Sequence, residues 1–136
     1  MKFVSHLFVA FVLCFAAQAF AGDTDPLFVN MTSDDAHRAN MAITFGSNQH
    51  ERGHPLTIFL NDRGVLVGSK ANSDKYATQQ KALVALVAKG ATVLVCPMCM
   101  KHFGVSENDL LPGLKVGKPE LTGGALFKDN TKTLTW

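Results

Sequence analysis

The sequence lacks the motifs by which many proteins bind nucleotides. No G-x-G-x-x-G follows the first apolar run, at residues 27–31, and no G-x-x-x-x-G-K-S/T occurs in the 136 residues. The sequence also lacks a large excess of charge of either sign. It has 13 basic and 11 acidic residues, and no run of basic residues forms. The sequence therefore supports neither dinucleotide nor P-loop nucleotide binding, and it gives no electrostatic basis for binding nucleic acid or an anionic membrane.

Cysteine is also scarce. Of the three cysteines, Cys14 lies in the leading apolar segment, so only Cys96 and Cys99 are expected in the mature protein. A C-x-x-C disulfide closes a very small loop and adds little stability, which favours redox or sulfur chemistry over a structural staple, the alternative. A structural zinc site is disfavoured because a second cysteine pair is missing.

Residues 1–21 have the pattern of a secretory signal peptide. The apolar stretch at residues 7–17 is too short to span a bilayer as a stable helix, and a small-x-small cleavage site ends at Ala19 or Ala21. An uncleaved membrane anchor is the alternative. We expect a single mature domain at residues 22–136, periplasmic or secreted, with no stable membrane association after cleavage. Such a compartment permits disulfides.

Apolar runs and amphipathic segments alternate along the mature chain. Strands are predicted at residues 27–31, 56–60, 91–95, 114–116 and 131–136. Helices are predicted at residues 34–51, 78–89, 96–103 and 119–129, with a polar loop at 68–76. Gly123 and Gly124 are expected to allow close backbone packing. The alternation predicts an α/β fold, a three-layer α/β/α domain with a mainly parallel sheet of about five strands.

Cys96 follows directly after the apolar, β-branched run at residues 91–95. A strand buried on both faces holds such a thiol still at the carboxyl edge of the sheet, where open α/β sheets bind ligands. Cys96 is therefore the candidate nucleophile, and Cys99 is its candidate resolving partner. A reactive thiol needs help to ionise. That help is expected from the helix that Pro97 begins, from Lys101 and His102 folding back, and from a hydrogen bond donated by Cys99.

Asp62 and Arg63 follow the strand predicted at residues 56–60. Because the carboxyl ends of parallel strands share one edge, both residues are expected on the same rim as Cys96, as supporting residues. The alternative is a loop salt bridge or a helix cap.

Soft side chains crowd the same stretch. Thioether, thiolate and imidazole groups suit Cu(I), so a metal site made of Cys96, Cys99, Met100 and His102 is an alternative interpretation. The methionines, Met98 included, could equally fill the core. No cofactor is expected.

The chain resembles the DsrE/DsrF-like family from Asp25 to Trp136. The resemblance rests on the blocks D-P-L-F-V-N-M-T-S-D-D, E-R-G-H-P-L-T-I-F-L-N-D, K-G-A-T-V-L-V-C-P-M-C-M-K-H-F-G and P-E-L-T-G-G-A-L-F. It implies a three-layer α/β fold with a parallel five-stranded sheet, and assembly into trimers or hexamers. In members that relay sulfur, a cysteine just after a sheet strand carries a persulfide, and by position that cysteine matches Cys96. Apparent export and the presence of Cys99 depart from the relay members that work in the cytoplasm.

These observations predict a periplasmic sulfur-handling protein. Cys96 would accept sulfane sulfur as a persulfide and transfer it to a partner thiol, as an enzyme or as a carrier. The partner would be a sulfur donor or acceptor protein or a small sulfur compound, and the protein would be a homo-oligomer. The alternatives are a thiol–disulfide oxidoreductase that uses Cys96 and Cys99, a non-enzymatic Cu(I) carrier, and a structural subunit with inert cysteines.

Overall fold

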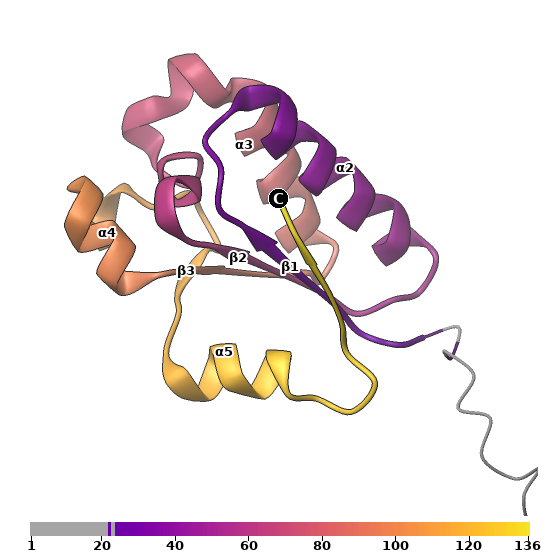
Figure 1. The fold of residues 1–136 in the computed structure, drawn as a ribbon. Helices are drawn as coiled ribbons and strands as arrows, with labels where there is room; N and C mark the ends of the chain where they lie inside the picture. Colours follow the sequence, from indigo (N-terminus) through magenta and orange to yellow (C-terminus); the bar gives the residue numbers. More distant parts are fainter. Residues whose placement is uncertain (1–21, 23) are drawn as a thin grey trace, which may run out of the picture.

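The computed structural model describes residue 22 and residues 24–136 (Figure 1). The predicted signal peptide at residues 1–21 lies outside the described residues. In the part of the chain that is described, none of the helices has both the length and the apolar character that a membrane crossing requires.

Strands and helices alternate, as the sequence predicts. The strands are β1 (Leu27–Met31), β2 (Leu56–Leu60), β3 (Thr92–Val95), β4 (Lys115–Val116) and β5 (Lys132–Thr135). The α-helices are α2 (Ala36–Glu51), α3 (Ser73–Ala88), α4 (Pro97–Phe103) and α5 (Pro119–Leu126). Short 3-10 helices lie between them: η1 (Asp62–Leu66), η2 (Lys70–Asn72) and η3 (Glu107–Asp109).

The five strands form one parallel sheet in the order β4-β3-β2-β1-β5. Helices α2 and α3 cover one face of this sheet, and α5 lies on the other (Figure 1). The predicted α/β fold with a parallel sheet is thereby confirmed. Because β1, β2 and β3 run the same way, their carboxyl ends share one edge, and η1 and α4 follow β2 and β3 there.

The core lies between the sheet and helices α2 and α3. Val29, Ile58 and Val93 of the three central strands are at most 1% exposed. Helix α2 meets the sheet with small side chains, and a Cβ added at Gly46 would lie 3.2 Å from Leu56 Cδ1. The absence of a side chain at Gly46 thus lets α2 lie close to the sheet.

The segment 68–76, predicted as a loop, contains η2 and the start of α3. Helix α3 therefore begins at Ser73, earlier than predicted. The polar side chains of this region bond to backbone groups: Gln80 Nε2 donates to the carbonyl oxygens of Val67 and Ser69. Polar composition alone does not reveal such bonds, so the sequence predicts a loop here.

Helix α5 ends at Leu126, before the predicted end at residue 129. The expectation of close packing at its two glycines is wrong. A Cβ at Gly124 would have no neighbour within 4 Å, and one at Gly123 would approach only Phe127, at 3.9 Å. Glycine weakens a helix interior, and this short helix gains no packing in return.

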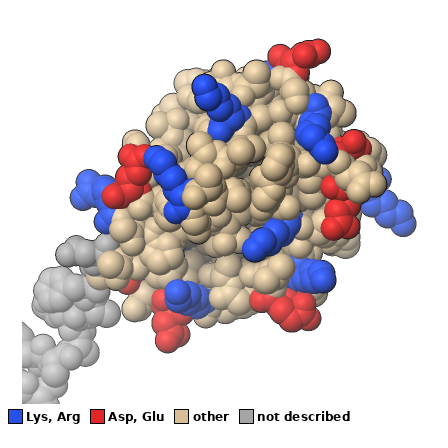
Figure 2. Space-filling model, turned by 180° about the vertical axis from the view of Figure 1, so that it is seen from behind, with Lys and Arg blue, Asp and Glu red and all other residues tan. Residues whose placement is uncertain are grey.

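Charged side chains are mixed over the surface shown in Figure 2. On that face Lys and Arg alternate with Asp and Glu, and no continuous patch of one sign forms among the residues drawn. The arrangement agrees with the balanced charge of the sequence.

Candidate functional site

The carboxyl edge of the sheet fixes the backbone on which the cysteines stand. Strands β2 and β3 pair in register up to Leu60 and Val95. The ladder then continues one residue further, because the Cys96 N–H donates to the Leu60 carbonyl oxygen at 2.9 Å. Cys96 is thus held by the sheet itself, in agreement with its predicted place on the rim.

Cys96 is the N-cap residue of α4. Its backbone is extended (φ −66°, ψ 116°), Pro97 opens the helix, and the Cys99 N–H lies 3.4 Å from Cys96 Sγ. The predicted start of a short helix at Pro97 is confirmed. Cys96 is only 7% exposed, so its sulfur lies at the boundary of the core rather than in open solvent.

Cys99 is the more open of the two cysteines. It is half-buried, and its sulfur lies 2.7 Å from that of Cys96; both are free thiols. A disulfide bond is about 2.05 Å long, so a bond between them needs only a small movement. A further contact comes from η1, where the Asp62 backbone N–H donates to Cys99 Sγ at 3.1 Å.

The pKa of the Cys99 thiol is raised. Burial is the largest cause, the hydrogen bond to Cys96 is the next, and the N–H of Asp62 acts in the opposite direction. Cys99 therefore keeps its proton and directs it at Cys96 Sγ. The structure thus pairs a protonated Cys99 with the sulfur of Cys96 at the end of β3.

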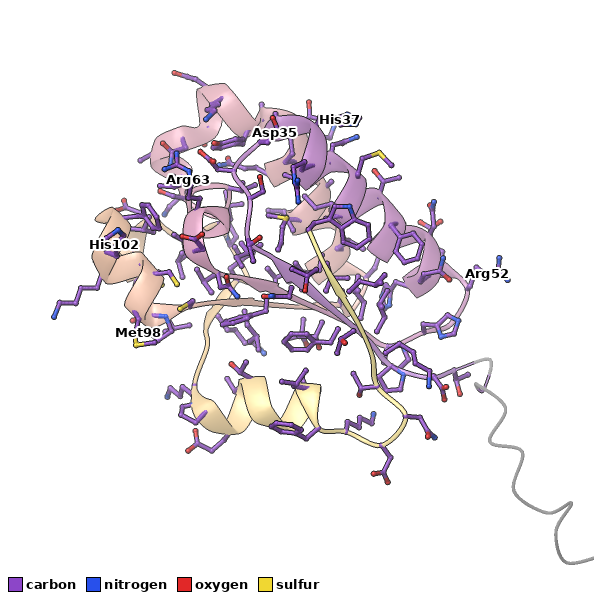
Figure 3. The ribbon with its side chains drawn as sticks, viewed as in Figure 1. Asp35, His37, Arg52, Arg63, Met98 and His102 are labelled. Atoms are coloured by element: carbon purple, nitrogen blue, oxygen red, sulfur yellow. The ribbon has the colours of Figure 1, made fainter. Side chains whose placement is uncertain are left out.

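The other predicted supporting residues of α4 lie apart from the sulfurs. Lys101 and His102 are exposed in the last turn, and the His102 ring packs edge-on against Phe103, with ring centroids 4.7 Å apart. In the described region neither makes a hydrogen bond to Cys96 or Cys99, so the expected folding back toward the thiol is not seen. Figure 3 shows Met98 and His102 at separate places on α4.

Met100 is buried in the core, whereas His102 is exposed. The four residues of the alternative Cu(I) site therefore differ widely in their surroundings. No group of three or more His, Cys, Asp or Glu side chains suited to a metal ion occurs among the residues that the structure describes.

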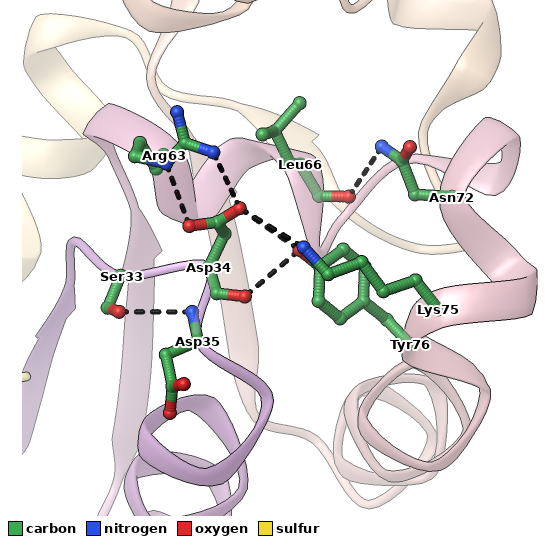
Figure 4. A network of polar contacts seen from close by, with 8 residues as sticks. All are labelled: Ser33, Asp34, Asp35, Arg63, Leu66, Asn72, Lys75 and Tyr76. Carbon is green, nitrogen blue, oxygen red and sulfur yellow. Dashed lines mark hydrogen bonds and ion pairs between the residues drawn. The ribbon is translucent and has the colours of Figure 1, made fainter.

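Asp34 is the site residue that the sequence did not identify. Figure 4 shows its carboxylate between η1 and α3. Arg63 donates to both carboxylate oxygens, at 2.8 and 2.9 Å, and Lys75 lies 3.4 Å away. The Tyr76 hydroxyl donates to the Asp34 carbonyl oxygen at 2.9 Å and lies 3.2 Å from its carboxylate. Arg63 thus forms a loop salt bridge, which was the alternative prediction for this residue.

Arg63 also reaches the cysteine helix. Its guanidinium carbon lies 5.7 Å from the centre of the Phe103 ring, a cation–π distance. The charge of Arg63 therefore ties η1 both to the loop after β1 and to α4. Asp35, not Asp34, caps helix α2, since its side chain accepts the Arg38 N–H at 2.8 Å.

The salt bridge makes the stability of the protein depend on pH. Arg63 holds the pKa of the Asp34 carboxyl far below its ordinary 3.8, against the opposing effect of burial. The carboxylate therefore stabilises the fold above pH 3.8, and this contribution is lost as the pH falls below that value. Asp34→Asn should lower the free energy of unfolding by about 2 kcal/mol at neutral pH. Measured by urea unfolding, the difference in free energy of unfolding between Asp34→Asn and the wild type should become smaller at acidic pH. A difference that does not change with pH would contradict this.

Asp62 acts on Cys99 in two opposite ways, through a favourable N–H and an unfavourable carboxylate charge. Asp62→Asn removes the charge, keeps the N–H and tolerates a positive φ. We therefore expect the pKa of Cys99 to fall and its alkylation by iodoacetamide to quicken by about twofold to threefold at neutral pH. The rate is measured in a Cys96→Ser background, and an unchanged or slower rate would refute the prediction.

Comparison with known sequences gives the family. The DsrE/DsrF-like family model matches residues 26–129. An uncharacterized protein of Methanopyrus kandleri, MK0008, is 32% identical over 80 residues, which are 58% of this chain and 66% of that protein. An uncharacterized protein of Methanocaldococcus jannaschii, MJ0989, is 34% identical over 80 residues, which are 58% of this chain and 70% of that protein. The match to the first relative thus spans slightly less than two thirds of its length.

Solved structures share the fold. The ychN protein of E. coli has a TM-score of 0.62 at 21% identity, over 83% of this chain and 99% of that one. MTH1491 of Methanobacterium thermoautotrophicum, of unknown function, has a TM-score of 0.66 at 16% identity, over 82% and 99% of the two chains. BT1422 of Bacteroides thetaiotaomicron, also of unknown function, has a TM-score of 0.63 at 22% identity, over 82% of this chain and 95% of that one. The family match covers most of the chain, and this protein belongs to the DsrE/DsrF-like family.

Proposed function

We propose that this protein receives sulfane sulfur on Cys96 as a persulfide and passes it to a partner thiol. The supporting observation is the pair of free thiols at the carboxyl edge of the sheet, with Cys99 Sγ 2.7 Å from Cys96 Sγ. Membership of the family supports the general role, and the geometry of the pair supports the division of labour between its two sulfurs.

Loading is a displacement at sulfur. The Cys96 thiolate attacks the outer sulfur of a donor persulfide, the bond between the two donor sulfurs breaks, and the donor leaves as a thiolate. Cys96 then carries –S–SH. Delivery reverses this step: an acceptor thiolate attacks the outer sulfur, and Cys96 leaves as the thiolate. Neither direction needs an external oxidant or reductant.

Cys99 offers a second outcome. Its thiolate can attack Cys96 Sγ of the persulfide, so that HS⁻ leaves and a Cys96–Cys99 disulfide forms. A dithiol reductant, itself oxidised to a disulfide, then restores both thiols. The short distance between the sulfurs makes this step available without rearrangement of α4.

The proposal is tested by loading. The reduced protein is exposed to inorganic polysulfide, alkylated under native conditions and weighed by mass spectrometry. We expect an adduct of one sulfur atom that dithiothreitol removes and that transfers to a second, acceptor thiol. A protein whose native thiols are alkylated readily but which never gains sulfur would contradict the proposal.

Thiol–disulfide exchange is the second candidate, because the same 2.7 Å contact favours a reversible disulfide. It predicts a reduction potential measurable against glutathione and turnover with a disulfide substrate. Cys99→Ser separates the two functions, since it should abolish the reversible disulfide and leave acceptance of sulfur on Cys96. Loss of both activities in that variant would favour exchange alone.

The proposal places this chemistry in the periplasm or outside the cell, on the sequence pattern of residues 1–21. Cell fractionation and the mass of the mature chain test it, and a mature chain that begins after Ala19 or Ala21 is expected. The proposed partner is a sulfur donor or acceptor protein or a small sulfur compound. The proposed homo-oligomer, a trimer or hexamer, is tested by light scattering.

A further inference from the structure

We propose that Asp34 and Arg63 are positioning residues for Cys99: their ion pair holds the turn at Asp62 so that its backbone N–H points at the Cys99 sulfur. The inference rests on the proposed function, because it assigns these residues to the step in which Cys99 attacks the loaded Cys96. Neither residue touches the sulfurs, so their effect is exerted through the backbone of η1.

The turn at Asp62 is held in an unfavourable conformation. Asp62 has a φ of 45°, which is uncommon for a residue with a side chain. Its side chain is exposed, so burial of that side chain does not offset the cost of this conformation. What the conformation achieves is the hydrogen bond from Asp62 N to Cys99 Sγ, at 3.1 Å. Strain that persists in this way needs neighbours that fix it.

Two neighbours fix this turn. Gly64 packs directly on the end of β1, where a Cβ would overlap the Met31 carbonyl oxygen, and its N–H donates to the Thr32 carbonyl oxygen at 3.2 Å. Arg63 is held by both oxygens of Asp34, at 2.8 and 2.9 Å. Asp34 is in turn bonded by the Tyr76 hydroxyl from α3. Asp62 therefore precedes two residues that are both anchored to residues 31–34, at the end of β1 and just after it.

The same turn meets α4 at two points. Asp62 N–H contacts Cys99, and the Arg63 guanidinium lies over the ring of Phe103. Residues 99 and 103 are four apart in a helix, so they lie on one face of α4. Contacts at both points set the position of α4 along η1, which places the Cys99 sulfur opposite the N–H.

An N–H directed at sulfur stabilises the thiolate more than the thiol. Cys99 needs that form when it attacks Cys96 Sγ and expels HS⁻. The titratable groups that face Cys99 are Cys96 on its own helix and Asp62 on η1, and both disfavour its negative charge. The N–H is the opposing favourable contact, so losing its alignment should make Cys99 a weaker thiolate former.

The test measures Cys99 alone, in the Cys96→Ser variant, by the rate of iodoacetamide alkylation as a function of pH. Adding Asp34→Asn or Arg63→Gln should move the midpoint upward by about one pH unit and slow the reaction about tenfold at neutral pH. Glu51→Gln is the matched control, because it removes the carboxylate of the remote Lys89–Glu51 pair and should leave the profile unchanged. The NMR chemical shift of the Asp62 amide proton should stop responding to Cys99 ionisation in Asp34→Asn and Arg63→Gln, but not in Glu51→Gln.

An unchanged midpoint in both Asp34→Asn and Arg63→Gln, with the fold intact by circular dichroism, would overturn the inference. Should these variants fail to fold, Arg63→Lys decides, because it keeps the charge but cannot bond both Asp34 oxygens; it should shift the midpoint in the same direction by a smaller amount, and no shift would refute the inference. The outcome does not depend on sulfur loading. If the midpoint of Cys99 alkylation shifts but the protein never accepts sulfur, the proposed function is refuted and the positioning role of Asp34 and Arg63 is retained.

Discussion

Cys96→Ser is expected to reduce persulfide loading by at least about 100-fold, because a serine hydroxyl at neutral pH is not a nucleophile toward sulfane sulfur. The fold should be retained, since serine keeps a side chain of similar shape and can still cap α4. The measurement is the initial rate of sulfur uptake from polysulfide, followed by alkylation and mass spectrometry. Near wild-type uptake in Cys96→Ser would show that the buried sulfur is not the acceptor.

Cys99→Ser is the matched variant in the same helix. It removes the resolving thiol but leaves Cys96, so loading should persist and the loaded form should decay more slowly. Sulfide release should fall by a similarly large factor, because no second thiol can attack Cys96 Sγ. Equal loss of loading in both variants would mean that the pair acts only as a disulfide couple.

Gly64→Ala is expected to be the most damaging single substitution in the site without touching either cysteine. The added Cβ would overlap the Met31 carbonyl oxygen, and backbone at the end of a central strand cannot move aside cheaply. We expect a loss of about 2–4 kcal/mol in the free energy of unfolding, measured by urea titration. Displacement of η1 should also weaken the Asp62 contact to Cys99.

Gly124→Ala is the control for this prediction. A Cβ there meets no atom within 4 Å, and the residue lies inside helix α5. Alanine should therefore be neutral or stabilise the protein by about 0.5–1 kcal/mol, through its better helix propensity. Similar destabilisation by both substitutions would contradict the steric explanation for Gly64.

The fold was predictable because burial leaves a direct mark on composition. The runs at residues 27–31, 56–60 and 91–95 are apolar since they form the central strands β1, β2 and β3. The place of Cys96 was predictable for a similar reason: a residue between an apolar strand and a proline that can open a helix has little choice of conformation.

The network around Asp34 was not predictable in the same way. Asp34 and Arg63 are separated by 29 residues, and exposed acids and bases in loops have many potential partners. Sequence assigned Asp34 to the start of α2, where Asp35 is the actual cap. Only the packing of η1 and α3 on the same edge selects the observed partners.

The conformation at Asp62 shows a further limit. In the turn N-D-R-G the natural candidate for a positive φ is Gly64. The structure gives the positive φ to Asp62, one of the residue types that adopt it more readily, while Gly64 stands where a side chain would overlap Met31. A tertiary contact thus accounts for the glycine, which the local sequence alone does not reveal.

Exposure separates the two cysteines in a way that the sequence did not reveal. Cys96 is 7% exposed, whereas Cys99 is half-buried beside it. Under the proposed function, a sulfur donor would have to reach a thiol that is less exposed than its neighbour.

The most direct measurement locates the added sulfur. After loading with polysulfide and native alkylation, trypsin releases the peptide 90–101, which holds both cysteines, and its fragment ions divide Cys96 from Cys99. The account predicts the extra sulfur on fragments that contain Cys96, with Cys99 alkylated directly. Extra sulfur on Cys99 alone, or on neither cysteine while both react with the alkylating agent, would contradict it.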